Sequence, residues 1–416
     1  MTYFEIASIL VVFSAVFGYI NEKYIKLPTT IGLMLIAIVF TLISIVSAYV
    51  SPLLFEHQKQ LIQNIDFSKV LLDVMLSFML FAGALHTNFE QLKVQRRPVL
   101  AFAFAGTLIS TFLVGTLIYL IFYLTGFKID LIYAFLFGAL ISPTDPIAVL
   151  GILKKIGIDK KIETVIVGES LFNDGIGVVI FLTLYKLAKE GINHLKPVDI
   201  LKLFGLEVVG GVLLGLFLGW LAYKMMKAID NFDTEVMITL AVVMGGTLLA
   251  HKMHVSAPLT MVTAGLVTGN DTVRNNAMSE ITEAYVDKFW ELIDVLLNTI
   301  LFVMIGMELL VISFKIQYVL AGMIAILIVL ISRYLSVKPL LTYFERRMNF
   351  IPKTEWIMTW GGLRGGISIA LALSLPKHMH RDIFLVMTYM VVIFSILVQG
   401  LTLPKLVNKI QPGENY

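Results

Sequence analysis

The sequence predicts an all-α polytopic membrane protein with about thirteen transmembrane helices, arranged as two inverted-topology repeats with paired broken helices. Three observations support this fold class. Of the 416 residues, 58% are hydrophobic and only 15% are charged, with a mean hydropathy of +0.88, whereas a soluble domain carries about 25% charge. The apolar residues stand in blocks of roughly 20, the length of helix that crosses a bilayer. Two of these blocks are interrupted by glycine or proline.

The apolar blocks place the thirteen spans in order along the chain. They are residues 3–20, 30–50, 70–86, 98–124, 131–153, 162–188, 203–223, 234–251, 257–270, 291–312, 317–341, 354–375 and 382–403. No cationic segment with a small-residue cleavage site precedes the first block, so we expect a retained helix rather than a signal peptide. Residues 274–291 mix charged and aromatic side chains, which predicts an amphipathic helix at the membrane surface.

The loop charges predict the orientation. With the N-terminus outside, 19 lysines and arginines fall on the cytoplasmic side and 11 on the outer side. This excess predicts that the N-terminus lies outside and the C-terminus in the cytoplasm. The expected location is the plasma (inner) membrane, as a multi-pass protein. Membrane lipid is therefore an expected partner, whereas the net charge of +3 is too small to indicate a nucleic acid. The absence of cysteine excludes disulfide and thiol chemistry.

The two interrupted spans occupy matching positions. The fifth span contains the sequence SPTDP at residues 142–146, and the twelfth contains GGLRGG at residues 361–366. The chain divides into a first repeat (1–202, spans 1–6), a connecting helix (203–227, span 7) and a second repeat (228–416, spans 8–13). Each break then lies in the fifth span of its repeat. Paired breaks in inverted repeats indicate the binding site of a transporter, where bare backbone groups line a cavity.

The sixth span carries a polar face near its middle. Glu169 and Asn173 are four residues apart, as are Ser170 and Asp174, so all four share one side of the helix. Asp174 lies about a dozen residues into the span, and a charged group at that depth is a functional candidate by default. A carrier that couples a cation to protons needs a carboxylate that binds either one. Asp174 can be that group; its structural alternative is a hydrogen bond between helices.

Neutral oxygens must replace the water of the bound ion. Ser170 and the carbonyl of Thr144, at the unwound stretch, can supply them. Asp145 can bind the ion directly or through water, cap the half-helix that begins at Pro146, or do both. The predicted Na⁺ site therefore comprises Asp174, Ser170, Thr144 and Asp145.

Arg364 lies near mid-membrane in the twelfth span and needs a partner there. Glu169 is the predicted partner, in a buried structural pair in which Arg364 offsets the carbonyl-rich break and orients Glu169 and Asn173. Arg333 and Glu308 lie near opposite faces of the membrane in this topology and are poor partners for each other. We expect Arg333 to snorkel or to pack among the core helices.

These motifs, in this order, resemble the sodium/proton antiporters of the NhaP branch of the monovalent cation/proton antiporter family. The residues that carry the resemblance are Ser142 to Pro146, Gly168-Glu169-Ser170, Asn173-Asp174 and Gly362 to Gly366. The resemblance implies a homodimer and a six-helix core domain in which the two broken helices cross. It also implies a dimerisation domain and an elevator-like movement of the core. The site residues that it implies are Asp174 for the ion and the proton, Thr144, Asp145 and Ser170 near the ion, and Arg364 linking Glu169 and Asn173.

The residue before Asp174 bears on stoichiometry in this family. Members with asparagine at this position are usually electroneutral, so Asn173 implies exchange of one Na⁺ for one H⁺. One departure concerns the third span, where some relatives place an acidic ligand. This chain has Phe81-Ala82-Gly83-Ala84 there, without a carboxylate, so the ligand set and the Na⁺ over K⁺ preference stay open.

Other functions fit the sequence less well. K⁺/H⁺ exchange is the alternative among carriers. An intramembrane aspartyl protease would use Asp145 and Asp174 as a dyad, but Pro146, the paired breaks and Arg364 oppose it, and a cation channel lacks its repeated filter. The sequence contains no phosphate loop, histidine–cysteine metal cluster or Ser/His/Asp spacing. We therefore expect no enzyme activity and no cofactor, only the transported ions Na⁺ (or Li⁺) and H⁺.

Overall fold

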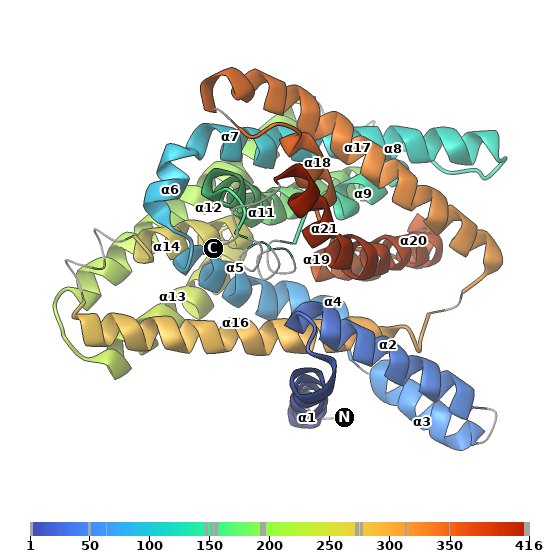
Figure 1. Ribbon diagram of the computed structural model, residues 1–416, viewed down its shortest axis with the longest axis horizontal. Coiled ribbons are helices and arrows are strands. Elements are labelled where there is room, and N and C mark those ends of the chain that lie inside the picture. The colour runs from blue at the N-terminus through green and yellow to red at the C-terminus, as the bar shows by residue number, and fades with distance from the viewer. Residues whose placement is uncertain are drawn as a thin grey trace.

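The described part of the protein is a bundle of helices (Figure 1). The computed structural model describes residues 3–48, 51–63, 65–145, 149, 153, 157–191, 197–270, 274, 278–312, 314–348 and 350–411. Ten helices among these residues are long and apolar enough to cross a membrane, and two shorter apolar helices accompany them. The described part of the chain contains no strand. The predicted all-α polytopic fold is confirmed.

Up to the middle of the chain, the helices follow the predicted spans closely. Their order is α1 (Tyr3–Ile20), η1 (Asn21–Ile25), α2 (Thr29–Ser47), α3 (Pro52–Gln63), α4 (Phe67–Lys69), η2 (Val70–Met75), α5 (Leu76–Leu85), α6 (Phe89–Val94), α7 (Arg96–Ala101), η3 (Phe102–Gly106), α8 (Thr107–Leu124), α9 (Leu131–Ile141) and α11 (Lys160–Glu190).

The remaining helices complete the bundle. They are α12 (Pro197–Met226), α13 (Phe232–Lys252), α14 (Ala257–Thr268), α16 (Glu280–Glu308), α17 (Ile316–Met348), α18 (Thr354–Trp360), α19 (Gly366–Ser374), η5 (Lys377–Met379), α20 (Arg381–Ile393), η6 (Phe394–Gln399) and α21 (Gly400–Ile410). The helix predicted over residues 274–291 has other bounds: α16 begins at Glu280 and continues without a break into the tenth span, and residues 275–277 lie outside the described residues. Ser279 caps this start, because its hydroxyl accepts a hydrogen bond from the Thr282 amide at 3.4 Å.

The first break follows from Pro143. Proline lacks an amide donor and restricts the residue before it, so α9 ends at Ile141. The Ser142 hydroxyl donates to the Gly138 carbonyl at 2.7 Å, which satisfies one of the last carbonyls of the helix. Residues 143–145 are not helical, which confirms the predicted break as far as Asp145; Pro146 lies outside the described residues.

The second break lies between α18 and α19. Residues 361–365 are not helical, and the helix resumes at Gly366, inside the predicted interval. The two breaks meet, since the backbone amide of Asp145 donates to the carbonyl of Leu363 at 2.8 Å. This hydrogen bond pairs backbone groups that the membrane interior would otherwise leave unsatisfied.

Helix α11 lies at the centre of the bundle (Figure 1). It packs against α9 on one side and against α12 and α14 on another. Of its most apolar 18-residue stretch 83% is buried, more than in the other long helices that the structure describes. A helix buried on all sides can carry polar groups at the centre of the protein only if other protein groups meet them.

Candidate functional site

Thr144, in the first break, is the centre of a buried hydrogen-bond network with α11. Its amide donates to Oδ1 of Asn173 at 3.2 Å, and Nδ2 of Asn173 donates to the Thr144 hydroxyl at 2.8 Å. The hydroxyl oxygens of Thr144 and Ser170 lie 2.8 Å apart. All three residues are at most 2% exposed. The structure thus brings together Thr144, Ser170 and Asn173, as the sequence predicts.

Asp174 lies beside this network on a small internal cavity, the Asp174 cavity. Its volume is about 50 Å³, and its lining includes Asp174, Asp145, Thr144 and Ser368. Asp174 is 5% exposed, and Asp145 is half-buried. Since one water needs about 10–15 Å³ of such space, the cavity can hold an ion with a few waters. The two predicted carboxylates therefore face one ion-sized space.

The backbone of the second break also lines this cavity and lies close to the first break. Gly365 and Gly366 line it beside Asp145. A methyl group on Gly365 would lie 2.7 Å from Cβ of Asp145, closer than any side chain tolerates. The glycine at this position therefore allows the second break to approach Asp145.

Arg364 binds the first break rather than Glu169. Its Nη1 donates to the carbonyl oxygens of Ser142 and Pro143, the latter at 2.9 Å. The side chain is 1% exposed, and its Nε and Nη2 meet no acceptor among the described residues. The cation thus offsets the partial negative charge of carbonyls that the broken helix leaves unpaired.

Glu169 pairs with Arg333 of α17, so the predicted direct pair of Glu169 with Arg364 is wrong. Nη1 of Arg333 donates to Oε1 of Glu169, and Nη2 donates to Oε2 at 2.9 Å. The two side chains are 5% and 1% exposed. Arg333 therefore packs in the interior and does not snorkel. Two donors that face two carboxylate oxygens make a strong, geometrically specific pair.

The sequence prediction missed Ser368 and the partner of Arg333. Ser368 lines the Asp174 cavity with a buried hydroxyl that meets no partner among the described residues. A lone serine in an apolar helix gives little signal, because its hydroxyl is usually satisfied by its own helix. Arg333 gave a clear signal, a charge well inside a span, but its partner depends on how α17 crosses α11.

The site can therefore offer carboxylate and hydroxyl oxygens to a hard cation. Oxygen ligands suit such ions, whereas imidazole and thiolate suit transition metals. In the part of the chain that the structure describes, no three His, Asp or Glu side chains come together as a metal site. The Asp174 cavity is a place where one small cation can exchange with a proton on a buried carboxylate.

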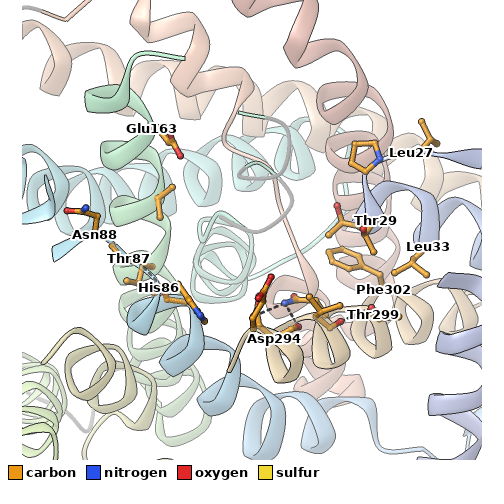
Figure 2. A pocket seen from close by; sticks show the side chains of 18 of the residues that line it. Leu27, Thr29, Leu33, His86, Thr87, Asn88, Glu163, Asp294, Thr299 and Phe302 are labelled. Carbon is orange, nitrogen blue, oxygen red and sulfur yellow. Dashed lines mark hydrogen bonds between the residues drawn. The ribbon is translucent and has the colours of Figure 1, made fainter. Parts of the chain in front are cut away.

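The structure contains a second, larger cavity, the vestibule, whose lining Figure 2 shows. Its volume is about 1010 Å³, and it is lined by η1, α2, α5, α6, α11 and α16. The two cavities share the lining residues Gly83 and Leu171. The vestibule therefore reaches the wall of the Asp174 cavity.

Three comparisons with known proteins agree with this geometry. The family model described as "Sodium/hydrogen exchanger, transmembrane" matches residues 11–409. The Na⁺/H⁺ antiporter NhaP of Pseudomonas aeruginosa is 46% identical over 415 residues, covering 99% of this chain and 97% of that protein. NhaH of Halobacillus dabanensis, also a Na⁺/H⁺ antiporter, is 34% identical over 93% of each chain. In fold, the chain is similar to the sodium proton antiporter MjNhaP1 of Methanocaldococcus jannaschii, with a TM-score of 0.74, 19% identity and 98% coverage of both chains.

Proposed function

The chain belongs to the sodium/hydrogen exchanger family, and we propose that it is a secondary antiporter that exchanges Na⁺ or Li⁺ for H⁺ across the plasma membrane. Membership of this family makes the chain a transporter rather than an enzyme. A K⁺/H⁺ antiporter is not favoured, because the curated relatives named above are Na⁺/H⁺ antiporters.

The position of Asp174 carries the proposal. This carboxylate is almost fully buried and faces an ion-sized cavity together with Asp145 and Thr144. In the proposed cycle, Asp174 binds either one cation or one proton, and both compete for the same oxygen atoms. Thr144 and Ser170 supply neutral oxygens in place of lost water, and Asp145 binds the ion directly or through water.

The proposed repeats, orientation and oligomeric state follow the family resemblance. Two inverted repeats, residues 1–202 and 228–416, would be joined by the helix at 203–227. The N-terminus would lie outside and the C-terminus in the cytoplasm, with the protein acting as a homodimer. The vestibule is lined by η1, α6 and the start of α11, next to the loops assigned to the cytoplasm. The described conformation would therefore be open to the cytoplasm.

Everted membrane vesicles test the proposal. After respiration acidifies the lumen, added Na⁺ or Li⁺ should collapse the pH gradient, and added K⁺ should do less. Asp174→Asn keeps the size of the side chain but removes the exchanging group, so this variant should insert normally and exchange nothing. Asp145→Asn should retain partial activity if this residue binds the ion through water. Exchange with K⁺ alone would overturn the sodium assignment, and near-normal turnover of Asp174→Asn would overturn the mechanism.

A further inference from the structure

The last long helix, residues 381–410, meets the chain just ahead of the second break. Helix α18 ends at Trp360, and the break occupies residues 361–365. α18 packs against α21, the final helix of the described chain (Figure 1). Between α20 and α21 the chain runs through η6, a stretch of π-helix over Phe394–Gln399. Such stretches widen a helix locally and are frequent at functional sites.

Gln399, the last residue of η6, binds the backbone of Trp360. Its Nε2 donates to the Trp360 carbonyl at 3.0 Å. In an unbroken helix this carbonyl would accept the amide of Arg364, but the break removes that partner. Ser395, one turn earlier in η6, donates its hydroxyl hydrogen to Oε1 of Gln399 at 2.8 Å, which orients the side-chain amide. Both Gln399 and Ser395 are 2% exposed. Gln399 therefore replaces a hydrogen bond that α18 lacks because of the break.

Thr402 of α21 holds the side chain of the same tryptophan. The indole Nε1 of Trp360 donates to the Thr402 hydroxyl oxygen at 2.8 Å. That hydroxyl donates its own hydrogen to the Val398 carbonyl at 2.5 Å, so its lone pairs remain to accept from the indole. The Trp360 ring also meets the edge of Phe394, with the ring centroids 6.4 Å apart. The backbone and the side chain of Trp360 are thus both held by the last long helix.

A short stretch of backbone joins Trp360 to the ion site. Residues 361–363 form a tight turn, because the amide of Leu363 donates to the carbonyl two residues earlier at 2.9 Å. The carbonyl of Leu363 accepts the backbone amide of Asp145 at 2.8 Å, and Asp145 lines the Asp174 cavity. A displacement of Trp360 therefore moves the carbonyl that holds Asp145, because only two residues of a tight turn lie between them.

We propose that Gln399 and Thr402 are positioning residues for the ion site. They hold Trp360, and with it the start of the second break, at the place where the break can bind the amide of Asp145. Neither side chain lines the Asp174 cavity, so both act through the backbone of the break. This inference rests on the proposed function and gives the last long helix a role in the affinity for Na⁺.

The first test removes each hydrogen bond by a substitution of similar size. Gln399→Met loses the donor to the Trp360 carbonyl, and Thr402→Val loses the acceptor of the indole. In purified protein reconstituted in liposomes, each variant should raise the KM for Na⁺ about fivefold, the equivalent of one hydrogen bond, and change kcat by less than about twofold. Thr402→Ser keeps the hydroxyl and should have the wild-type KM. A wild-type KM in both Gln399→Met and Thr402→Val, whatever their Tm, would make the role merely structural and overturn the proposal.

Thr388→Val is the matched control for Thr402→Val. Thr388 is buried on the same long helix, and its hydroxyl donates to the Phe384 carbonyl at 2.7 Å. Valine has nearly the same shape, so this variant removes a buried hydroxyl whose hydrogen bond stays within its own helix. Its KM for Na⁺ should change by less than about twofold. A KM raised as much as in Thr402→Val would mean that any hydroxyl lost from this helix weakens binding, which would overturn the specific role of Thr402.

The second test follows the first break without transport. Deuterium uptake at the backbone amide of Asp145, measured by mass spectrometry on purified protein, should be faster in Gln399→Met than in the wild type. The physical reason is that this amide then loses its acceptor in the displaced second break. Thr388→Val should take up deuterium as the wild type does. Unchanged uptake in Gln399→Met would contradict the transmission from Trp360 to Asp145 and overturn the proposal.

The two tests separate this inference from the proposed function. Deuterium uptake reports on the two breaks whether or not the protein transports ions. If the wild type shows no Na⁺-dependent proton flux, antiport is wrong, and faster uptake in Gln399→Met would still support the positioning role. If the wild type transports normally and Gln399→Met has an unchanged KM and unchanged deuterium uptake, only the positioning role is wrong.

Discussion

Asn173 and Thr144 form a reciprocal pair in which the side chain of Asn173 serves both the backbone amide and the hydroxyl of Thr144. The amide of asparagine is suited to this task, because it has an acceptor and a donor side by side. Asn173 therefore orients the broken backbone of residues 143–145 toward Asp174. In this arrangement Asn173 is a positioning residue for the ion site, whatever it implies about stoichiometry.

Asn173→Ala should weaken Na⁺ binding while leaving Asp174 in place. Two hydrogen bonds of about 1 kcal/mol each disappear, so the apparent KM for Na⁺ should rise by up to about thirtyfold. The measurement is proton flux in reconstituted liposomes as a function of Na⁺ concentration. An unchanged KM would mean that Thr144 keeps its position without Asn173 and would contradict this role.

Arg333→Ala should lower the stability of the folded protein. Breaking a buried ion pair leaves Glu169 without its partner, at a cost of about 3–5 kcal/mol. The yield of monodisperse protein in detergent and its Tm report this loss. Glu169→Gln combined with Arg333→Gln should recover part of it, because neither side chain then carries an unpaired charge.

Arg364 provides the contrast to Arg333. Arg364→Ala removes the donor to the carbonyls of Ser142 and Pro143 but leaves the Glu169–Arg333 pair intact. Glu169→Gln should therefore not rescue Arg364→Ala. A rescue would mean that Glu169 and Arg364 interact directly after all.

Gly365→Ala should impair the site through Asp145. The added methyl group would collide with Cβ of Asp145, so one of the two breaks must move. We expect a lower Tm together with a KM for Na⁺ raised about tenfold or more. Gly245→Ala is the control, since a methyl group there meets nothing within 4 Å. Because alanine is the better helix former, this control should be as stable as the wild type or more stable by up to about 1 kcal/mol. Equal behaviour of the two variants would contradict the close approach of the breaks.

The coupling ratio should be one Na⁺ for one H⁺. If Asp174 is the exchanging carboxylate, its net charge is the same with either ion bound, and a full cycle moves no charge. A membrane potential of 100 mV is worth about 2.3 kcal/mol per charge, so any uncompensated charge is readily detected. A potential clamped with valinomycin should leave the equilibrium Na⁺/H⁺ ratio unchanged. A shift with voltage would indicate that Asp145 carries a second proton.

Competition at Asp174 also predicts the pH dependence of exchange. Raising the pH removes protons that compete with Na⁺, so the Na⁺ concentration for half-maximal rate should fall. At high pH protons become too scarce to complete the return step, and at low pH they occupy the site, so the rate falls at both extremes. Proton flux over a matrix of pH and Na⁺ concentrations measures both effects. A half-maximal Na⁺ concentration independent of pH would contradict binding at one site.

The sequence by itself determined the features that depend on local composition and spacing. The length of the apolar blocks matches the length of helix that crosses a bilayer, so the spans could be located. The glycines and prolines inside two of these blocks then located the broken helices. Helical periodicity placed Ser170, Asn173 and Asp174 on one face of α11. Because Pro143 has no amide hydrogen, the sequence also predicted that the helix before it ends ahead of Thr144. The convergence of these residues then follows, because a polar face in a buried helix must meet polar groups from elsewhere in the chain.

The tertiary structure alone decided which partners meet. A charge inside a span must be compensated, but the sequence cannot say by which residue, since this depends on how distant helices cross. Arg333 therefore reaches Glu169, while Arg364 turns to the carbonyls beside Pro143. The same holds for Ser368 in the Asp174 cavity. This serine is unremarkable in its own helix and becomes informative only because packing leaves its hydroxyl buried without a partner among the described residues.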